Sequence, residues 1–253
     1  MRTLAVIPAR LGATRLPRKP LRLLAGLPLV VRVWERVTET GLAERCVVAT
    51  DSDEVAQAVR RHGGEVVMTS PDHPSGTDRV AEVAARPEFA GFDAVLNVQG
   101  DEPFIGMDAV RGAVEMVTGR GFPLGTAAAM AGLDVLMDPN VVKVVAADDG
   151  RAMYFSRAAI PYLRDRADAP LLRDRIWRHV GVYAYARDAL ARWVALPPHP
   201  FERIERLEQL RPLAAGLAMG VACIADAGLS GIDTEDDLVR ANADWTNFNT
   251  GPN

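Results

Sequence analysis

The sequence has few cysteines, no long apolar run and no excess of positive charge, and each absence excludes a class of protein. No window approaches the ~18 apolar residues of a membrane span, and the apolar run within MRTLAVIPAR is far too short for a signal-peptide core. Two isolated cysteines, Cys46 and Cys223, give neither a disulfide framework nor a zinc site. A net charge of −4 argues against nucleic-acid binding by phosphate neutralisation. We therefore expect a cytoplasmic protein with no nucleic-acid or membrane partner.

What remains is an ordinary globular composition. Of the 253 residues, 49% are hydrophobic and 25% are charged, which is enough apolar material to bury a full core. The sequence shows no linker, no fixed-period repeat and no low-complexity stretch. We therefore expect a single domain over residues 1–253.

The first half alternates short apolar runs with amphipathic stretches. Helices are expected between and after the strands, at about 28–40, 53–63, 77–86 and 107–117. The expected strands are 4–9, 45–50, 65–69 and 93–99. This alternation predicts an α/β fold with a mostly parallel central sheet covered by helices.

The second half changes character and predicts extra, partly antiparallel strands. Three strands are expected close together, at 141–148, 152–156 and 177–186. The charged segment 162–175 interrupts them and suits either a flap or a subunit contact. Helices at about 187–195 and 202–213, a strand at 220–226 and a closing helix at 234–245 complete the expected fold.

The loop 9–21 directly follows the first strand and carries most of the candidate phosphate ligands. Ligands of open α/β sheets bind beyond the carboxyl ends of the strands, so this loop belongs at a site. Guanidinium and ammonium groups there suit a triphosphate, although a solvated basic loop is the alternative. The Walker A pattern is absent. The basic residues of this loop are Arg10, Arg15, Arg18 and Lys19, and Arg22 directly follows it.

Two aspartates are candidate Mg²⁺ ligands. Asp101 in VQGDEP directly follows the fourth expected strand, where a carboxylate could hold Mg²⁺ beside phosphates. Its alternative is a turn or capping aspartate, and Glu102 could be the ligand instead. Asp233 in GIDTEDDL is a second candidate, with helix capping by Asp233 or Thr234 as its alternative.

The strand 177–186 has a face suited to a polyhydroxylated ligand. Val180, Val182 and Ala184 alternate onto the core face. The other face combines aromatic and hydrogen-bonding side chains around a glycine, and rings packed under a helix are the alternative. That face holds Trp177, His179, Gly181, Tyr183 and Tyr185.

The expected helix 201–213 contains one misplaced charge. Phe201, Ile204 and Leu207 form an apolar stripe, and Glu208 projects inside it. An unpaired carboxylate there is costly, so Glu208 either pairs with an arginine such as Arg157 or faces a wet pocket.

The order of these motifs resembles the bacterial CMP-KDO synthetase (3-deoxy-manno-octulosonate cytidylyltransferase) family from about residue 4 to 240. The likeness is carried by VIPARLGATRLPRKPL, VATDSDEVAQAV, HPSGTDRVAEV, VLNVQGDEPFI, PNVVKVV, YFSRAAIPY, RHVGVYAY, ERIERLEQLR and GIDTEDDL. The resemblance implies a nucleotide-diphospho-sugar transferase-like fold and transfer of CMP from CTP to an acidic sugar, for lipopolysaccharide biosynthesis. It also implies a Mg²⁺ cofactor and a homodimer, with a dimerisation and sugar-binding subregion at about 141–213.

The resemblance also implies roles for individual residues. Asp101 and Asp233 match the magnesium-binding pair, and Arg10, Arg15 and Lys19 match the triphosphate loop. Ser75, Gly76 and Arg79 match the segment around cytosine and its ribose. With Asp101, the triphosphate residues form the expected catalytic set, and the sequence offers no dedicated general base. The sugar side is matched by Gln99, Arg157, His179, Tyr183, Glu208 and Gln209.

Some positions depart from the family pattern, and some alternatives stay open. Arg18 stands where the phosphate loop commonly has glycine, Arg203 where histidine is frequent, and Trp177 where a smaller aliphatic residue is usual. Segment 163–176 aligns poorly. The acidic sugar could be an 8-amino relative of the octulosonate or, less in keeping with the motifs, a sialic acid. A non-catalytic nucleotide-binding module on the same fold is the remaining alternative.

Overall fold

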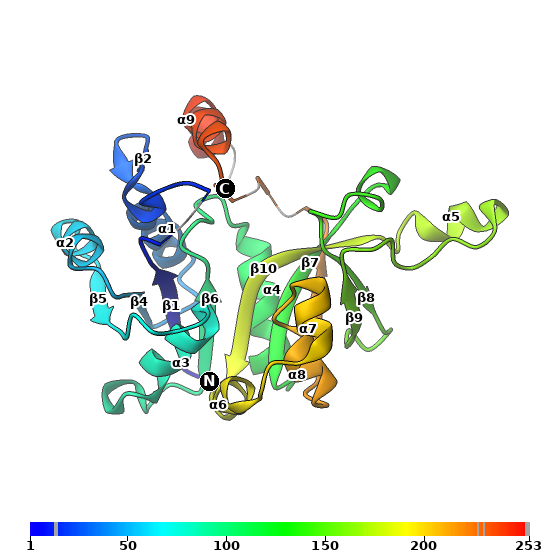
Figure 1. The fold of residues 1–253 in the computed structure, drawn as a ribbon, viewed down its shortest axis with the longest axis horizontal. Helices are drawn as coiled ribbons and strands as arrows, with labels where there is room; N and C mark the ends of the chain where they lie inside the picture. The colour runs from blue at the N-terminus through cyan, green and yellow to red at the C-terminus, as the bar shows by residue number, and fades with distance from the viewer. Residues whose placement is uncertain (13–14, 227, 230, 251–253) are drawn as a thin grey trace. The chain divides into compact units, whose positions relative to one another are not determined.

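The computed structural model describes residues 1–12, 15–226, 228–229 and 231–250. The fold is α/β, with a mostly parallel central sheet, some antiparallel strands and helices around it (Figure 1), which confirms the predicted fold class. The chain divides into two compact units. We name the units by their place in the sequence. The outer unit is Arg2–Ile105 with Gly228–Asn253, and the middle unit is Gly106–Ala227. The single domain over 1–253 stays a prediction.

The outer unit is built on a parallel sheet in the order β6-β1-β4-β5. In register, Val6 of β1 lies between Val47 of β4 and Asn97 of β6. Every residue of β1 is buried, as expected for a strand covered on both faces. The strands are β1 (Thr3–Ala9), β4 (Arg45–Thr50), β5 (Glu65–Met68) and β6 (Ala94–Val98), close to the four predicted ones.

Helices of the outer unit begin where the sequence offers capping side chains. Ser52 accepts a hydrogen bond from the backbone N–H of Val55 at 3.4 Å, and Ser75 accepts one from Asp78 at 3.2 Å. Short elements of this unit are η1 (Lys19–Leu21), β2 (Leu23–Leu24), β3 (Leu27–Pro28) and η2 (Pro87–Phe89). Its helices are α1 (Leu29–Glu39), α2 (Asp53–Arg61), α3 (Gly76–Ala85) and α9 (Glu235–Thr250).

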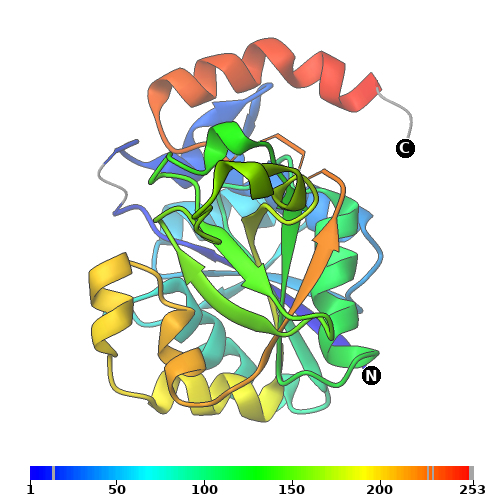
Figure 2. The same ribbon diagram turned by 90° about the vertical axis from the view of Figure 1, so that its right-hand side faces the viewer.

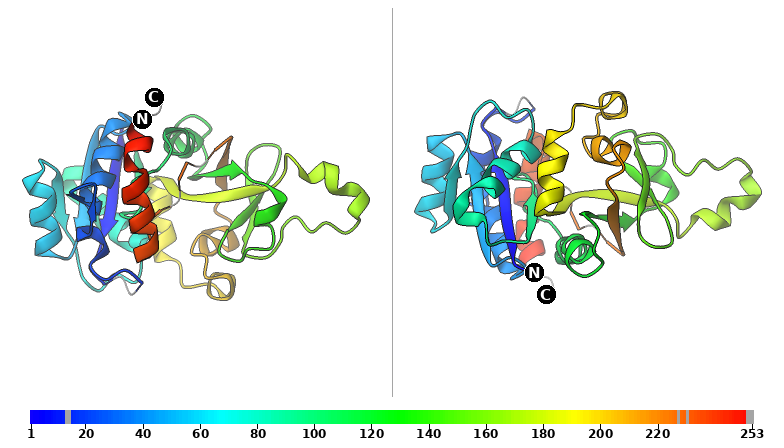
Figure 3. Two further views of the ribbon diagram at one scale, coloured as in Figure 1. Left: turned by 90° about the horizontal axis from the view of Figure 1, so that it is seen from above. Right: turned by 90° about the horizontal axis from the view of Figure 1, so that it is seen from below.

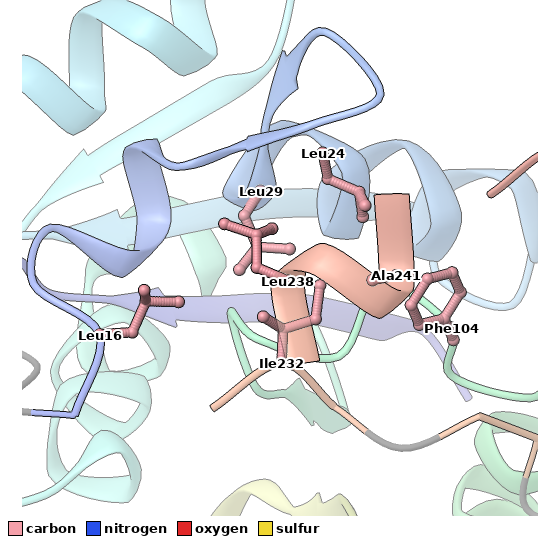
Figure 4. Close-up of a cluster of buried hydrophobic side chains, with 7 residues drawn as sticks. All are labelled: Leu16, Leu24, Leu29, Phe104, Ile232, Leu238 and Ala241. Atoms are coloured by element: carbon pink, nitrogen blue, oxygen red, sulfur yellow. The ribbon is translucent and has the colours of Figure 1, made fainter. Parts of the chain in front are cut away.

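The closing helix α9 is held by an apolar cluster far from it in sequence. Figure 3 shows α9, in red, alongside the blue segment that carries β2 and α1. Figure 4 shows Leu238 of α9 beside Leu29, with the other side chains of the cluster around them. Because Ile232 belongs to this cluster, the packing also fixes the segment that leads into α9. The cluster consists of Leu16, Leu24, Leu29, Phe104, Ile232, Leu238 and Ala241.

The middle unit contains the antiparallel strands. β10 runs antiparallel to β7 and β8, β8 runs antiparallel to β9, and β11 lies parallel to β7 (Figure 2). The sequence does not predict β7, because its small residues LGTAAAM carry neither β-branched nor aromatic enrichment. The strands are β7 (Leu124–Met130), β8 (Lys143–Ala146), β9 (Ala152–Ser156), β10 (Trp177–Ala186) and β11 (Met219–Ile224).

Most helices of the middle unit are short. The segment that carries α5 projects from the unit's strands (Figures 1 and 3), where the sequence predicts an excursion. None of the helices in the described parts of the chain is both long and apolar enough to cross a membrane. The helical elements are α4 (Met107–Thr118), η3 (Leu133–Val135), η4 (Arg166–Asp168), α5 (Ala169–Leu172), α6 (Arg187–Ala195), α7 (Pro200–Glu205) and α8 (Leu210–Ala214).

The single helix predicted over 202–213 is wrong, because the chain forms α7 and α8 with a break between them. Arg206 adopts a left-handed conformation with φ +55° and ends α7. In a continuous helix, Pro212 would lack its N–H and its ring would clash with the carbonyl of Glu208. The predicted apolar stripe is wrong as well, since Phe201 is 49% exposed and Ile204 is 77% exposed.

Lys143, one of two lysines in the sequence, is fully buried in β8. Its ammonium donates to the carbonyls of Asp138, Val141 and Arg157 at 2.8, 2.7 and 2.6 Å. Burial lowers the pKa of Lys143, and three acceptors match the three N–H donors of the charged form. Lys143 therefore links the loop before β8 to the backbone of Arg157.

The α9 cluster predicts unequal effects of two neighbouring substitutions. Leu238 is 4% exposed and Val239 is 63% exposed. Leu238→Ala is expected to lower the free energy of unfolding by about 2–5 kcal/mol because it leaves a cavity, whereas Val239→Ala changes it by about 0.5 kcal/mol or less. Urea denaturation of both variants measures this, and equal destabilisation would contradict the packing of α9.

Candidate functional site

A cavity of about 280 Å³ lies in the outer unit, at the carboxyl ends of β1 and β6. This is where open α/β sheets bind ligands. The cavity brings together nine outer-unit residues that the sequence predicts for the site, but not the weaker candidates Arg18, Arg22 and Glu102. The nine residues are Arg10, Arg15, Lys19, Ser75, Gly76, Arg79, Gln99, Asp101 and Asp233.

Close backbone contacts set the positions of the two aspartates. A Cβ on Gly100 would lie 2.8 Å from the carbonyl oxygen of Pro8, so only glycine lets the chain leaving β6 pass so close to β1. The backbone N–H of Ile232 donates to the carbonyl of Asp101 at 2.9 Å. This bond, together with the α9 cluster, places Asp233 next to Asp101.

Lys19 lies between these two carboxylates. Its Nζ is 2.6 Å from Asp101 Oδ2 and 2.8 Å from Asp233 Oδ1, and the Lys19 side chain is only 13% exposed. Burial by itself lowers the pKa of Lys19, but the two carboxylates together raise it above its ordinary value. Arg15 Nη2 lies 3.0 Å from Asp233 Oδ2, so two cations and two anions balance in charge.

The two aspartates suit a magnesium ion by their chemistry and convergence. Asp101 and Asp233 both approach one cation, the Lys19 ammonium, with oxygen atoms. Mg²⁺ in nucleotide enzymes typically uses one or two carboxylates and completes its shell with phosphate oxygens and water. Among the described residues, no group of three or more histidine, cysteine or acidic side chains converges as a metal site. The pair therefore fits a metal shared with phosphates rather than one enclosed by protein.

The arginines of the first loop differ in what they contact. Arg10 is exposed at the cavity and makes no hydrogen bond or ion pair within the described parts of the chain. Arg18 has φ +57° and pairs with Glu54 of α2. The resemblance noted from the sequence leads us to expect glycine at this position, and glycine adopts such a left-handed backbone conformation most readily. Arg18 therefore keeps the loop's backbone geometry while its side chain turns to α2.

Arg79 is held rigidly inside the outer unit. Its side chain is 3% exposed, donates to Thr69 Oγ1 and lies 3.4 Å from Asp51 Oδ2. A fixed, buried guanidinium is suited to reading a hydrogen-bonding edge of a ligand. Ser75 instead uses its hydroxyl locally, because Oγ donates to Asp78 Oδ2 at 2.6 Å and accepts from the Asp78 N–H.

His73 also lines the cavity, although the sequence analysis does not single it out. His73 Nε2 lies 2.6 Å from Glu82 Oε2, and Glu82 also accepts from the Ser70 N–H and from Arg86. Burial by itself raises the pKa of Glu82, but these hydrogen bonds together lower it to about 2. The sequence did offer one indication that His73 lies at the site, because it is only two residues before Ser75 in HPSGTDR.

Gln99 lies with the outer-unit residues rather than with the other residues predicted for the sugar side. Its Nε2 donates to Asn97 Oδ1 at 3.3 Å. Gln99 Oε1 would be 3.4 Å from a Cβ on Gly76. The structure therefore places Gln99 beside the start of α3.

In the middle unit, β10 brings His179 and Tyr183 together on one face, with ring centroids 5.4 Å apart. Phe155 approaches His179 edge-on at 5.0 Å. Burial lowers the pKa of His179 to about 4, so its imidazole is neutral near pH 7. Tyr185 is predicted on the same ligand-facing side, but it is fully buried, and its ring centroid lies 5.6 Å from that of Trp193. For Tyr185 the alternative prediction, a ring packed in the core, is therefore confirmed.

Arg157, another residue predicted for the sugar, binds Glu205, which the sequence does not predict for the site. Glu205 accepts from Ser156 Oγ at 2.6 Å and from the Arg157 N–H at 2.9 Å. The guanidinium of Arg157 donates to the carbonyls of Glu205 and Pro139. Glu208 lies half-buried in the turn between α7 and α8, and its charge, after burial and Tyr185, contributes to raising the pKa of Tyr183.

Gln209 is 3% exposed, yet its side-chain amide makes no hydrogen bond to any described residue. His179 and Tyr183 are half-buried, and neither the Tyr183 hydroxyl nor His179 Nδ1 makes a hydrogen bond to a described residue. Polar atoms that are not bonded within the protein have hydrogen-bonding capacity left for a polar ligand.

The Glu82 cluster predicts a pH-dependent stability. A carboxyl whose pKa is lower in the folded state stabilises above its unfolded pKa, and this stabilisation is lost as pH falls from about 4.5 toward 2. Glu82→Gln is expected to cost about 1–2 kcal/mol at pH 7 after allowance for partial exposure, with the difference shrinking below pH 4.5. Urea denaturation between pH 7 and 3 measures it. Glu39→Gln, at an exposed carboxylate 4.0 Å from Arg36, is the control. A difference independent of pH would contradict the assignment.

Comparisons with known proteins agree with this geometry. The cytidylyltransferase family model matches residues 4–219. The chain is 66% identical over 245 residues to 3-deoxy-manno-octulosonate cytidylyltransferase from Gemmatimonas aurantiaca, covering 97% of this chain and 95% of that protein.

Two solved structures are similar to the chain over nearly its full length. One is CMP:2-keto-3-deoxy-manno-octonic acid synthetase complexed with CTP, with a TM-score of 0.89, 37% identity, and 98% and 99% of the two chains covered. The other is 4-diphosphocytidyl-2C-methyl-D-erythritol synthase from Anaerococcus prevotii. Its TM-score is 0.62 at 14% identity, with 97% of this chain and 98% of that chain covered. This similarity shows a shared fold. The family model matches residues 4–219, and the 66% identical relative matches 97% of the chain. Together with the cation-lined cavity, these matches show that the chain belongs to the cytidylyltransferase family.

Proposed function

We propose that the protein transfers CMP from CTP to 3-deoxy-D-manno-octulosonate and releases pyrophosphate, as a cytoplasmic enzyme of lipopolysaccharide biosynthesis. One observation carries the catalytic part. A cavity at the ends of β1 and β6 combines paired carboxylates, Asp101 and Asp233, with cationic side chains from the first loop. The sugar is proposed from the names of the 66% identical relative and of the 37% identical structure.

In the proposed reaction the anomeric hydroxyl of the sugar attacks the α-phosphorus of CTP. The new bond joins that oxygen to phosphorus, the bond to the bridging oxygen of the β-phosphate breaks, and the hydroxyl proton leaves to solvent or pyrophosphate. Arg10, Arg15 and Lys19 bind the triphosphate and stabilise the charge that develops on pyrophosphate. A Mg²⁺ ion held by Asp101 and Asp233 would supply further charge neutralisation and lower the pKa of the attacking hydroxyl.

Lys19 has two tasks in this proposal. Without nucleotide, its ammonium holds the two carboxylates together at 2.6 and 2.8 Å. With nucleotide, we expect the same ammonium to contact phosphate oxygens beside those carboxylates. Because both lysine partners are anionic, exchanging one anionic contact for another keeps the lysine charged throughout.

Arg79 is proposed to read the cytosine. Thr69 and Asp51 hold its guanidinium in place before any ligand arrives. A preorganised buried donor that is left unpaired by the wrong base penalises that base. Gly76 at the first turn of α3 allows the ligand to approach the backbone, and Ser75 acts through its cap.

The sugar is proposed to contact the middle-unit residues His179, Tyr183, Gln209, Glu208 and Arg157. The sugar contact expected for Gln99 stays a prediction. Support comes from the unused hydrogen-bonding capacity of His179 Nδ1, the Tyr183 hydroxyl and the Gln209 amide. A polyhydroxylated ligand supplies both donors and acceptors, which such a mixed set requires.

We further propose that the protein is a homodimer through the subregion at about 141–213. Apolar side chains are exposed on and near the projecting segment, including Tyr162 at 81% and Leu171 at 72%. Exposed apolar side chains of this kind are typical of subunit contacts. Leu171→Glu is expected to convert the dimer to a monomer in light scattering after size exclusion, whereas Val239→Glu on α9 is not. A wild-type monomer at micromolar concentration would overturn this proposal.

The metal assignment predicts a loss of turnover without loss of nucleotide binding. Asp101→Asn and Asp233→Asn are each expected to lower kcat by about a hundredfold or more, because the lost carboxylate acts mainly in the transition state. Calorimetric titration should show that CTP still binds. Asp236→Asn, at an exposed position on α9, is the matched control and keeps its activity. Retained turnover in either site variant would exclude the carboxylate pair as the metal site.

A further inference from the structure

The hydroxyl of Thr126, fully buried in β7, lies at an irregularity in β10. The register between β10 and β7 shifts between Val180 and Tyr183, which leaves extra backbone opposite Thr126. Thr126 Oγ1 is 2.7 Å from the carbonyl oxygen of Val182, 3.3 Å from that of Val180, and 3.0 Å from His179 Nε2.

The proton positions in this group follow from its chemistry. A threonine hydroxyl has one hydrogen, and backbone carbonyls only accept. At 2.7 Å the Val182 contact requires that hydrogen, because two oxygen lone pairs would otherwise repel. Thr126 Oγ1 therefore accepts the hydrogen bond from His179, and the hydrogen between the two residues is carried by Nε2.

A neutral histidine that carries its hydrogen on Nε2 has a lone pair on Nδ1. His179 is neutral near pH 7, because burial lowers its pKa to about 4. Within the described parts of the chain, no residue bonds to Nδ1, and the rings of Phe155 and Tyr183 lie with their centroids 5.0 and 5.4 Å from that of His179. Thr126 thereby determines what kind of ligand atom His179 can bind.

We propose that Thr126 is a positioning residue that fixes His179 as the Nε2–H tautomer, so that Nδ1 accepts a hydrogen bond from a hydroxyl of the sugar. The tautomer is a property of the protein alone, whereas the sugar contact rests on the proposed function. A hydroxyl at that point of the sugar is accepted, and an ether or a deoxy position there is disfavoured because it has no hydrogen to donate.

The tautomer can be tested on the unmodified protein. The chain has four histidines, so ¹⁵N-labelled histidine gives a small set of ring signals in a long-range ¹H–¹⁵N spectrum. At pH 7 without ligand, His179, assigned by its loss in His179→Gln, is expected to show a protonated Nε2 and an unprotonated Nδ1. A protonated Nδ1, or a charged ring, would overturn the proposal whatever the enzyme's substrate is.

Substitutions of Thr126 test the consequence for the sugar. Thr126→Val removes the hydroxyl with little change in volume and is expected to mix the His179 tautomers. We expect it to raise the sugar KM by about five- to tenfold, the loss of one hydrogen bond, with the CTP KM changed by about twofold or less. Thr126→Ser keeps the hydroxyl and is expected to retain the wild-type His179 tautomer and the wild-type sugar KM.

The matched control is Thr118→Val at the end of α4, whose hydroxyl donates to the Val114 carbonyl at 3.0 Å. It is expected to leave the spectrum and both KM values unchanged. A wild-type Nε2–H tautomer with an unchanged sugar KM in Thr126→Val would refute the sugar contact, while a change in the KM for CTP alone would refute the placing of His179 on the sugar side. If Thr126→Val does not fold, the wild-type spectrum and Thr126→Ser still decide the proposal.

Discussion

The contact of Lys19 with Asp101 and Asp233 is the interaction on which the outer-unit site depends. It joins three loops that are distant in sequence, at 2.6 and 2.8 Å, with Arg15 balancing the remaining charge. A largely buried ammonium is stable there only because both carboxylates are present, and the carboxylates tolerate each other only because the ammonium lies between them. The same arrangement concentrates cations and oxygen ligands where a triphosphate with its metal would bind.

The middle unit follows a different principle at His179, Tyr183 and Gln209, because these candidate ligands are neutral and a backbone carbonyl fixes the hydrogen of the Thr126 hydroxyl beside His179. The irregularity in β10 supplies carbonyls that engage the Thr126 hydroxyl, and the hydroxyl in turn orients His179. Lys143 plays a comparable part for Arg157, since its ammonium binds the Arg157 carbonyl at 2.6 Å. We therefore propose that phosphate chemistry relies on charge in one unit and that sugar recognition relies largely on directed hydrogen bonds in the other.

Strand and loop positions were predictable from the sequence where a local pattern determines them. β4 and β10 occur as predicted, and residues from Arg10 to Asp233 meet at one cavity because parallel strands end at one edge. The break at Arg206, the strand β7 and the burial of Tyr185 were not predictable, because tertiary packing decides them. Glu205 and Thr126 were missed for the same reason, because their partners lie 49 and 56 residues away in the sequence. His73 pairs with Glu82 only nine residues away, and its position close to Ser75 in the sequence was a usable signal.

Pyrophosphate release tests the central claim most directly. CTP, UTP and ATP are each combined with 3-deoxy-manno-octulosonate, its 8-amino relative, a sialic acid or no sugar. We expect pyrophosphate release to depend on the sugar. Its rate should be highest with CTP and 3-deoxy-manno-octulosonate, roughly tenfold or more above the rate with every other pair. A faster rate with the 8-amino sugar would contradict the sugar assignment alone. Release that is independent of sugar, equal with UTP, or absent from all pairs would contradict cytidylyl transfer itself.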